Sequence, residues 1–293
     1  MHAQPFEYHR AESIDHAITL LETVSNATPL AGGHGLIPAM KKREQTPDAV
    51  VDIGHLDSLC GIDATATEIT IGALATHTQV LASDPLQSQV PVVPQTVSNI
   101  TGGKQVHNFA TIGGNLARAH PGYDYEGALL AADAAVHVRG PDGDRRVPID
   151  TFVQGACQTV LTDTELITSI ELPTGGDHRG GGYSKKKEPA SGNAIVGVAT
   201  DITFESPQRD RVATARVAVN GIQPSAVRLT TVENELAECE RSDETIERAA
   251  AVAGDKLDPD DLLDNKKASS EYRHSLLEPE VYKSLLHSVL RPQ

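Results

Sequence analysis

Two short glycine-rich segments constrain this chain more than any other feature of its sequence. The first is Ala31-Gly32-Gly33-His34-Gly35, and the second is Thr111-Ile112-Gly113-Gly114-Asn115. Paired glycines let backbone N–H groups converge on a bulky anion, because no Cβ intervenes and positive φ angles are permitted. One Gly-Gly pair is typical of an ordinary turn. Two pairs, each entered from an apolar segment, favour a ligand that carries a diphosphate.

The common nucleotide-binding motifs do not account for these segments. Gly-x-Gly-x-x-Gly is absent from the first strand-to-helix turn, which excludes the Rossmann fingerprint. A Walker A loop is also excluded, because Gln105 follows Gly103-Lys104 and Ser98 stands where the first glycine belongs. No Gly-x-Ser-x-Gly elbow is present. The residues therefore indicate a phosphate-bearing cofactor bound without a protein nucleophile.

The histidines and cysteines predict no metal site. The 12 histidines form no His-Glu-x-x-His motif, and we expect His34 and His120, beside the proposed ligand segments, to be structural. Cys60, Cys157 and Cys239 lie far apart without a Cys-x-x-Cys pair, which argues against structural zinc or an iron–sulfur cluster. This sparse, odd set favours a reducing compartment, and we expect each cysteine to be a small buried hydrophobic residue.

The charge of the chain argues against a nucleic-acid partner. Asp and Glu number 40 against 25 Lys and Arg, a formal net charge of -15, whereas binding of nucleic-acid phosphates needs a basic surface. An acidic surface also fits adaptation to high salt, which is one hypothesis beside that of an ordinary acidic protein. No apolar run is long enough for a membrane span, and the first residues do not form a signal peptide. We therefore expect a cytoplasmic protein.

The pattern along the chain predicts an α+β fold of three segments: two cofactor-binding lobes over 1–57 and 58–175, and a sheet-plus-helices domain over 180–293. Glycines near 173–182 favour a linker, and the Gly, Asn and Thr content of 97–115 favours a loop region. The predicted helices cover 14–21, 76–82, 126–132, 226–239, 243–253 and 272–290, and the predicted strands cover 49–53, 68–71, 136–139, 146–149, 166–172, 194–204 and 211–220.

At the two glycine segments the chain resembles the FAD-binding medium subunit of the molybdenum hydroxylases, the family of the xanthine and carbon monoxide dehydrogenases. The stretch from Ala31 to Pro38 is similar to the family signature Ala-Gly-Gly-x-Ser-Leu-x-Pro. The stretch from Gln105 to Leu116 is similar to the second flavin loop, and its continuation ends on the family's aspartate at Asp124. The resemblance covers essentially the whole chain in order.

This resemblance implies a two-lobed FAD-binding domain of the PCMH type, followed by the family's C-terminal flavoprotein domain. FAD would lie between the lobes with its diphosphate on the backbone amides of the two loops, and Asp124 would bond the adenosine ribose. Ile167 would make an apolar contact and Lys185 a basic one, although Lys185-Lys186-Lys187 alone is typical of a solvated charge run. The implied binding residues are Ala31, Gly32, Gly33, His34, Gly35, Leu36, Thr111, Ile112, Gly113, Gly114, Asn115, Asp124, Ile167 and Lys185.

The resemblance also implies partners. In the family, a large molybdopterin subunit hydroxylates the substrate, and a small subunit carries electrons through [2Fe-2S] clusters to FAD. The electrons then leave to an external acceptor, which is NAD, a quinone or another compound. This chain has neither the cysteines for the clusters nor a molybdopterin segment. It is expected to be one subunit of a three-component complex.

Three departures from the family pattern bear on the flavin. Gly35 stands where the family has Ser, His120 replaces an acidic residue, and Asn193 stands in a shortened segment where an aromatic or apolar residue is usual. Two alternatives stay open. One is a stand-alone flavin oxidoreductase acting on a small organic substrate, and the other is a non-catalytic assembly subunit that has lost its flavin.

Overall fold

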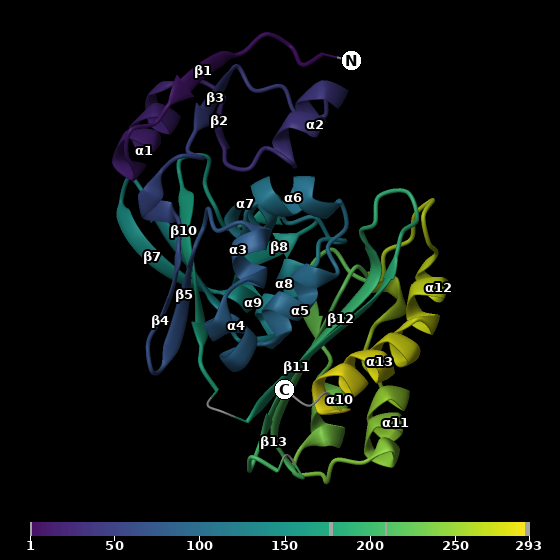
Figure 1. The fold of residues 1–293 in the computed structure, drawn as a ribbon. Coiled ribbons are helices and arrows are strands. Elements are labelled where there is room, and N and C mark those ends of the chain that lie inside the picture. The colour runs from purple at the N-terminus through teal and green to yellow at the C-terminus, as the bar shows by residue number, and fades with distance from the viewer. Residues whose placement is uncertain (1, 176–177, 209, 291–293) are drawn as a thin grey trace.

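The computed structural model describes residues 2–175, 178–208 and 210–290. Over these residues the strands form four sheets of three, five, four and two strands. Figure 1 shows the order in space: the N-terminal lobe at one end, the central helices and the five-stranded sheet beside it, and the C-terminal sheet with its helices at the opposite end. The helices found in this part of the chain include none long and apolar enough to cross a membrane.

The N-terminal lobe is a parallel sheet with the strand order β1-β3-β2. Ser13 caps helix α1 by accepting a hydrogen bond from the His16 N–H, and buried Ala17, Ile18 and Leu21 form its inner face. Strand β2 leads directly through the first glycine segment into helix α2, which places that segment at the carboxyl end of a parallel strand. The elements are β1 (Glu7–Arg10), α1 (Ile14–Thr23), β2 (Ala27–Leu30), α2 (Leu36–Lys42) and β3 (Ala49–Asp52).

The second lobe is an antiparallel sheet with the order β4-β5-β10-β6-β7, covered by a group of short helices. Its core is aliphatic, with Ile69, Ile71 and Ile170 on the strands packing against Leu129. The strands are β4 (Ile62–Ala64), β5 (Glu68–Gly72), β6 (Ala135–Gly140), β7 (Gly143–Pro148) and β10 (Leu166–Pro173), with the ribbon β8 (Val153–Gly155) and β9 (Gln158–Thr159). The helices are α3 (His77–Leu81), α4 (Asp84–Gln89), α5 (Val92–Ser98), α6 (Gly103–Phe109), α7 (Ile112–Arg118), α8 (Tyr125–Ala131) and α9 (Ile149–Phe152), with the 3-10 turn η1 (Asp57–Leu59).

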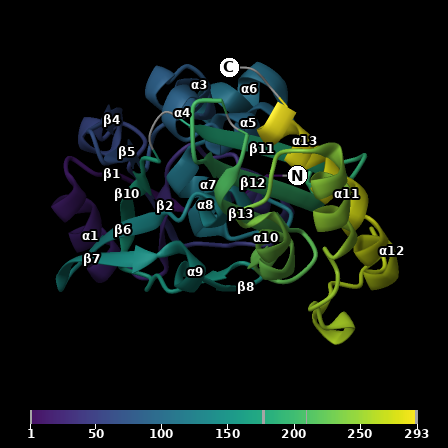
Figure 2. The ribbon, with the colours of Figure 1, turned by 90° about the horizontal axis from the view of Figure 1, so that it is seen from below.

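The C-terminal sheet, β11-β12-β13-β14, belongs to two hydrophobic cores at once. On β12, Ala199 packs into the core of the second lobe, while its neighbour Val198 packs into the C-terminal core, because successive side chains of a strand face opposite ways. Figure 2 shows this sheet between α5 and α8 on one side and α10, α11 and α13 on the other. The elements are β11 (Arg179–Lys187), β12 (Ala194–Phe204), β13 (Val212–Asn220), β14 (Val227–Arg228), α10 (Thr230–Leu236), α11 (Asp243–Ala251), η2 (Pro259–Asp261), α12 (Ser270–Ser275) and α13 (Leu277–Leu290).

The predicted α+β fold is confirmed, and most predicted elements form, but several local predictions are wrong. The segment 97–115 holds α6 and the start of α7 instead of a loop, and 226–239 begins with strand β14 before α10. Gly180–Gly182 are part of β11 rather than a linker, while residues 176 and 177 lie outside the described residues. The three cysteines are free, with Cys60 and Cys157 exposed and Cys239 half-buried, so none is a buried hydrophobic residue. The domain boundaries stay predictions.

Candidate functional site

A cavity of about 570 Å³ lies where the two glycine segments meet. Its walls come from the N-terminal lobe, the second lobe and the turn between β11 and β12, so all three segments of the fold contribute to it. A cavity of this size is typical of a small-molecule or cofactor site. The predicted residues that line it are Ala31, Gly32, Gly33, His34, Gly35, Leu36, Thr111, Gly113, Gly114, Asn115, Asp124 and Ile167.

The first glycine segment presents unpaired backbone donors to this cavity. Within the described residues, the N–H groups from Gly32 to Leu36 have no intrachain acceptor. Gly33 has a φ of +74°, a conformation that favours glycine. A Cβ on Gly32 would lie 1.9 Å from the Phe109 carbonyl oxygen, so a side chain there would force α6 away from the loop. A row of unpaired amides of this kind is an anion site.

The second glycine segment is fixed by bonds within the chain. The N–H groups of Ile112 and Gly113 donate to the carbonyls of Ala75 and Ala73, at 3.0 and 2.9 Å. Thr111 caps α7, because its hydroxyl accepts the Gly114 N–H at 3.2 Å. Gly114 lies inside this helix without a positive φ. This segment shapes the cavity wall, while the open amides belong to the first.

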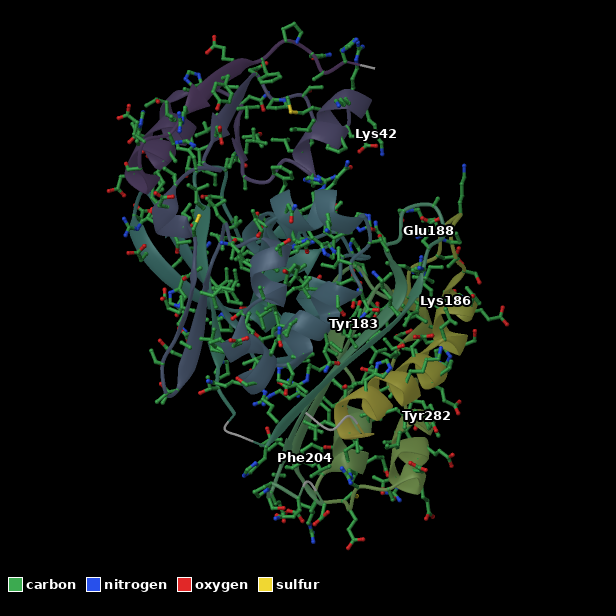
Figure 3. All side chains as sticks on the ribbon, viewed as in Figure 1. Lys42, Tyr183, Lys186, Glu188, Phe204 and Tyr282 are labelled. Carbon is green, nitrogen blue, oxygen red and sulfur yellow. The ribbon has the colours of Figure 1, made fainter. Side chains whose placement is uncertain are left out.

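Two predicted residues, Ile112 and Lys185, lie outside the cavity wall. Ile112 is fully buried in the hydrophobic core. Lys185, on β11, has a side chain only 4% exposed, and its Nζ donates to the Asp124 carboxylate at 2.8 Å, so the solvated-charge interpretation is wrong for this lysine. Asp124 also accepts a hydrogen bond from the hydroxyl of Tyr183. Figure 3 shows Tyr183 where β11 passes the central helices.

Asp124 is thus a buried carboxylate at the junction of two domains. Burial raises the pKa of its carboxyl group, and the adjacent ammonium of Lys185 and hydroxyl of Tyr183 oppose that rise. Both carboxylate oxygens already have partners on β11, although the residue also lines the cavity. Its first role in the fold is therefore to connect α8 to the C-terminal sheet.

The turn between β11 and β12 closes one end of the cavity. Ser191, Gly192 and Asn193 line the cavity, and a Cβ on Gly192 would lie 1.9 Å from the hydroxyl oxygen of Thr101. Glu188 holds the turn by accepting the N–H groups of Ala190 and Ser191. The Ser191 side chain and these two N–H groups lower the pKa of the Glu188 carboxyl group. Figure 3 shows Glu188 and Lys186 at this end of the hairpin. Asn193, one of the departures from the family pattern, is thus part of the cavity wall.

The sequence analysis did not identify two cavity residues whose side chains could act on a ligand, His77 and Arg118. His77 is 1% exposed, and its Nδ1 lies 3.2 Å from the Tyr125 hydroxyl. Burial, with smaller effects of His107 and His34, lowers its pKa to about 4, so its ring is neutral at pH 7. No local motif marks this histidine. Arg118 follows Gly114 by four residues, so the helical period of α7 could have placed it on the cavity face.

Across the described residues, no group of three or more His, Cys, Asp and Glu side chains is placed to hold a metal ion. The polar groups that line the cavity suit an organic anion: they are unpaired amides, one aspartate held in an internal ion pair, and an arginine.

Comparisons with known proteins agree with this arrangement. The family model described as the FAD binding domain in molybdopterin dehydrogenase matches residues 4–175, and the model of the CO dehydrogenase flavoprotein C-terminal domain matches residues 182–288. The carbon monoxide dehydrogenase medium chain of Hydrogenophaga pseudoflava is 33% identical over 76% of this chain and 77% of its own length. The glyceraldehyde dehydrogenase medium chain of Sulfolobus acidocaldarius is 30% identical over 94% and 96%.

A solved structure of carbon monoxide dehydrogenase from Hydrogenophaga pseudoflava covers all of this chain and all of its own matched chain, with a TM-score of 0.91 and 29% identity. Fold and family models together define a flavoprotein of the oxidoreductase class. The chain belongs to the family of FAD-binding medium subunits of the molybdenum hydroxylases, and the predicted family and the predicted cofactor, FAD, are confirmed.

Proposed function

We propose that this chain is the electron-transfer subunit of a multi-subunit molybdenum hydroxylase, taking electrons from [2Fe-2S] clusters and passing them through FAD to an external acceptor. The observation that carries the proposal is the meeting of the two glycine segments around one cavity, with unpaired amides from Gly32 to Leu36. The family membership supplies the class of cofactor.

The residues present fit FAD. Its diphosphate is a dianion, and the unpaired amides of the first segment are suitable donors for it. The cradle is narrow at Gly32, where the Phe109 carbonyl leaves no room for a Cβ. Ile167, which is 5% exposed, adds an apolar wall from β10. When bound, FAD would supply one- and two-electron redox chemistry, and the protein would bind, orient and tune it.

The proposed roles of the site residues follow from these positions. The amides of Gly32, Gly33, His34, Gly35 and Leu36 would bind the diphosphate. Thr111, Gly113, Gly114 and Asn115 would shape the opposite wall, with Ile112 anchoring their segment in the core. Asp124 with Lys185 would position the adenosine end. Neutral His77 would present a ring that neither attracts nor repels an anion at pH 7. No side chain here is proposed as a nucleophile.

We propose that electrons reach the site from another chain. The three cysteines cannot supply the four thiolates of a [2Fe-2S] cluster, and no metal-holding group is present in the described residues. The relatives are named as medium chains and as an FAD-binding subunit. We therefore propose that a small cluster-bearing subunit delivers the electrons, a large molybdopterin subunit generates them, and NAD, a quinone or another acceptor removes them.

The test is purification of the tagged chain from its native host under conditions that preserve weak complexes. Flavin, iron and molybdenum are then measured per chain. We expect one FAD per chain, with iron and molybdenum co-purifying in stoichiometric amounts. A metal-free, flavin-bearing protein that oxidises a small organic compound by itself would instead establish the stand-alone oxidoreductase. A chain without flavin in an intact complex would establish the assembly subunit.

A further inference from the structure

Arg118 projects from the cavity face of α7. Gly114, Ala117 and Arg118 all line the cavity, and their spacing places them on one side of the helix. Arg118 is the last residue of α7 and is only half-exposed. Arg118 therefore belongs to the wall of the site and is partly shielded from solvent.

This guanidinium has no partner within the chain. Among the described residues, Arg118 forms neither a hydrogen bond nor an ion pair, although the chain carries a net charge of -15. Arginines elsewhere in the second lobe are paired: Arg145 binds both oxygens of Glu165, and Arg146 binds Glu171. A half-buried arginine that lines a cavity and has no carboxylate partner of its own among the described residues is available to an anionic ligand.

The stem of Arg118 crosses to the first glycine segment. A Cβ built on Gly35 would have one neighbour within 4 Å, the Cγ of Arg118 at 4.0 Å. Gly35 lies among the unpaired amides of Gly32 to Leu36. The arginine and these amides thus border the same part of the cavity, and the missing side chain at position 35 leaves space beside the arginine.

Two cations act on His120, which follows Arg118 closely in the sequence. Burial lowers the pKa of His120, and the charges of Lys267 and Arg118 lower it further. Lys267 comes from the C-terminal part of the chain, so cations from two parts of the fold act on His120. Positive charge beside the cavity, such as that of Arg118, favours binding of an anion.

We propose that Arg118 is a cofactor-binding residue whose guanidinium binds the diphosphate of FAD, opposite the amides of the first glycine segment. This inference rests on the proposed function and deepens it. Arginine suits this task because its planar fork can donate two parallel hydrogen bonds to phosphate oxygens. The contact lies outside both glycine segments and takes the place of the hydroxyl that Gly35 lacks.

The test compares ligands that differ in the diphosphate. The full-length chain is stripped of flavin, and the affinities of FAD, ADP and riboflavin are measured by calorimetry or fluorescence for the wild type, Arg118→Ala, Arg118→Lys and Lys104→Ala. Lys104 is an exposed cation on α6 outside the cavity wall, so its variant controls for general loss of positive charge. Circular dichroism and the melting temperature confirm that each variant is folded.

We expect Arg118→Ala to weaken the binding of FAD and of ADP by roughly tenfold or more, as for the loss of a hydrogen bond to a charged group. Riboflavin should bind as it does to the wild type, Arg118→Lys should lose less than Arg118→Ala, and Lys104→Ala should change little. Equal losses for riboflavin, or unchanged affinity for all ligands, would overturn the role of Arg118 while leaving the proposed function intact. A folded wild type that binds neither FAD nor ADP would refute the proposed function and this inference together.

Discussion

The ammonium of Lys185 and the carboxylate of Asp124 form an ion pair of 2.8 Å across the junction between the C-terminal sheet and α8, with their side chains 4% and 6% exposed. Little solvent screens such a pair, so the two charges depend on each other. The Tyr183 hydroxyl, also on β11, donates to the other carboxylate oxygen. The aspartate that the resemblance assigned to the cofactor therefore also holds two domains together.

Lys185→Ala should destabilise the protein strongly, by about 3–5 kcal/mol, because it leaves Asp124 buried without its counter-charge. Urea unfolding monitored by circular dichroism measures this. The exposed Lys186→Ala is the matched control and should change stability by less than about 0.5 kcal/mol. The double variant Lys185→Met with Asp124→Leu should be more stable than Lys185→Ala. Equal stability of Lys185→Ala and Lys186→Ala would show that the pair does not form.

Gly32→Ala should abolish FAD occupancy, whereas Gly35→Ala should retain it. The added Cβ at position 32 would meet the Phe109 carbonyl at 1.9 Å, but at position 35 it would meet only the Cγ of Arg118 at 4.0 Å. Flavin absorbance per chain after purification measures the difference. Gly35→Ser, which restores the family's hydroxyl, should bind at least as tightly as wild type. Full occupancy in Gly32→Ala would mean that the two lobes do not meet at this contact.

Glu126 should make the protein less stable as the pH rises. Its Oε1 accepts the Ala226 N–H at 2.7 Å, its Oε2 has no partner among the described residues, and burial raises its pKa from 4.5 to about 7. The native state then binds more protons than the unfolded state between these values, so stability falls across that window, by about 3 kcal/mol at most. Glu126→Gln should remove this loss when unfolding free energies at pH 5 and pH 8 are compared. A variant with the wild-type pH dependence would contradict the assignment.

His77 should make the protein less stable as the pH decreases, which is opposite to the effect of Glu126. Its pKa falls from 6.5 to about 4 in the folded protein, so the unfolded state binds more protons in that range and stability is lost as the pH decreases. The full loss is about 3 kcal/mol. Between pH 4.5 and 6.5 the opposite effects of Glu126 and His77 on the stability of the wild type partly cancel. His77→Gln keeps a polar partner for Tyr125. In this variant the effect of Glu126 remains, so the free energy of unfolding should rise as the pH decreases. A flatter profile than that of the wild type would be the contrary result.

The FAD should be bound non-covalently. Of the described residues that line the cavity, His34, His77 and Tyr123 are of types that could serve as a tether, and His120 is close to Tyr123 in the sequence. The His34 Nδ1 already lies 3.1 Å from the Gly32 carbonyl oxygen. Acid precipitation should release all of the flavin into the supernatant. Colour that stays with the pellet would indicate a covalent bond, and alanine variants of these residues would then identify its position.

Regular alternation made the strands the most predictable part of the fold. The predicted strand over 194–204 has the bounds of β12, because its side chains face two separate cores. Helices α6 and α7 were not predictable from composition, since Gly, Asn and Thr favour loops. The helix α7 forms because Thr111 caps it and because Ala73 and Ala75 accept its first N–H groups. Those acceptors come from a distant part of the chain.

The candidate site was predictable where backbone chemistry defines it and unpredictable where tertiary contacts do. The glycine segments indicated a phosphate ligand by themselves, and the resemblance supplied FAD. The burial of His77 depends on Tyr125 and His107, which no local pattern connects to it. The burial of Lys185 was likewise not predictable from the local sequence, because its neighbours Lys186 and Lys187 are exposed as a charge run predicts.

The three glycines of β11 have a practical consequence for anyone who engineers this protein. A Cβ on Gly180 would lie 2.2 Å from the Ser288 carbonyl oxygen, and one on Gly181 would lie 2.1 Å from the Val92 nitrogen, so helices approach the bare strand from both faces. The sequence there has the composition of a flexible spacer. A protease site, an epitope tag or new chain ends introduced at these glycines would nevertheless enter a closely packed interior. Such insertions belong in an exposed turn, such as the one at Asp142 and Gly143, where a Cβ on the glycine would meet no neighbour.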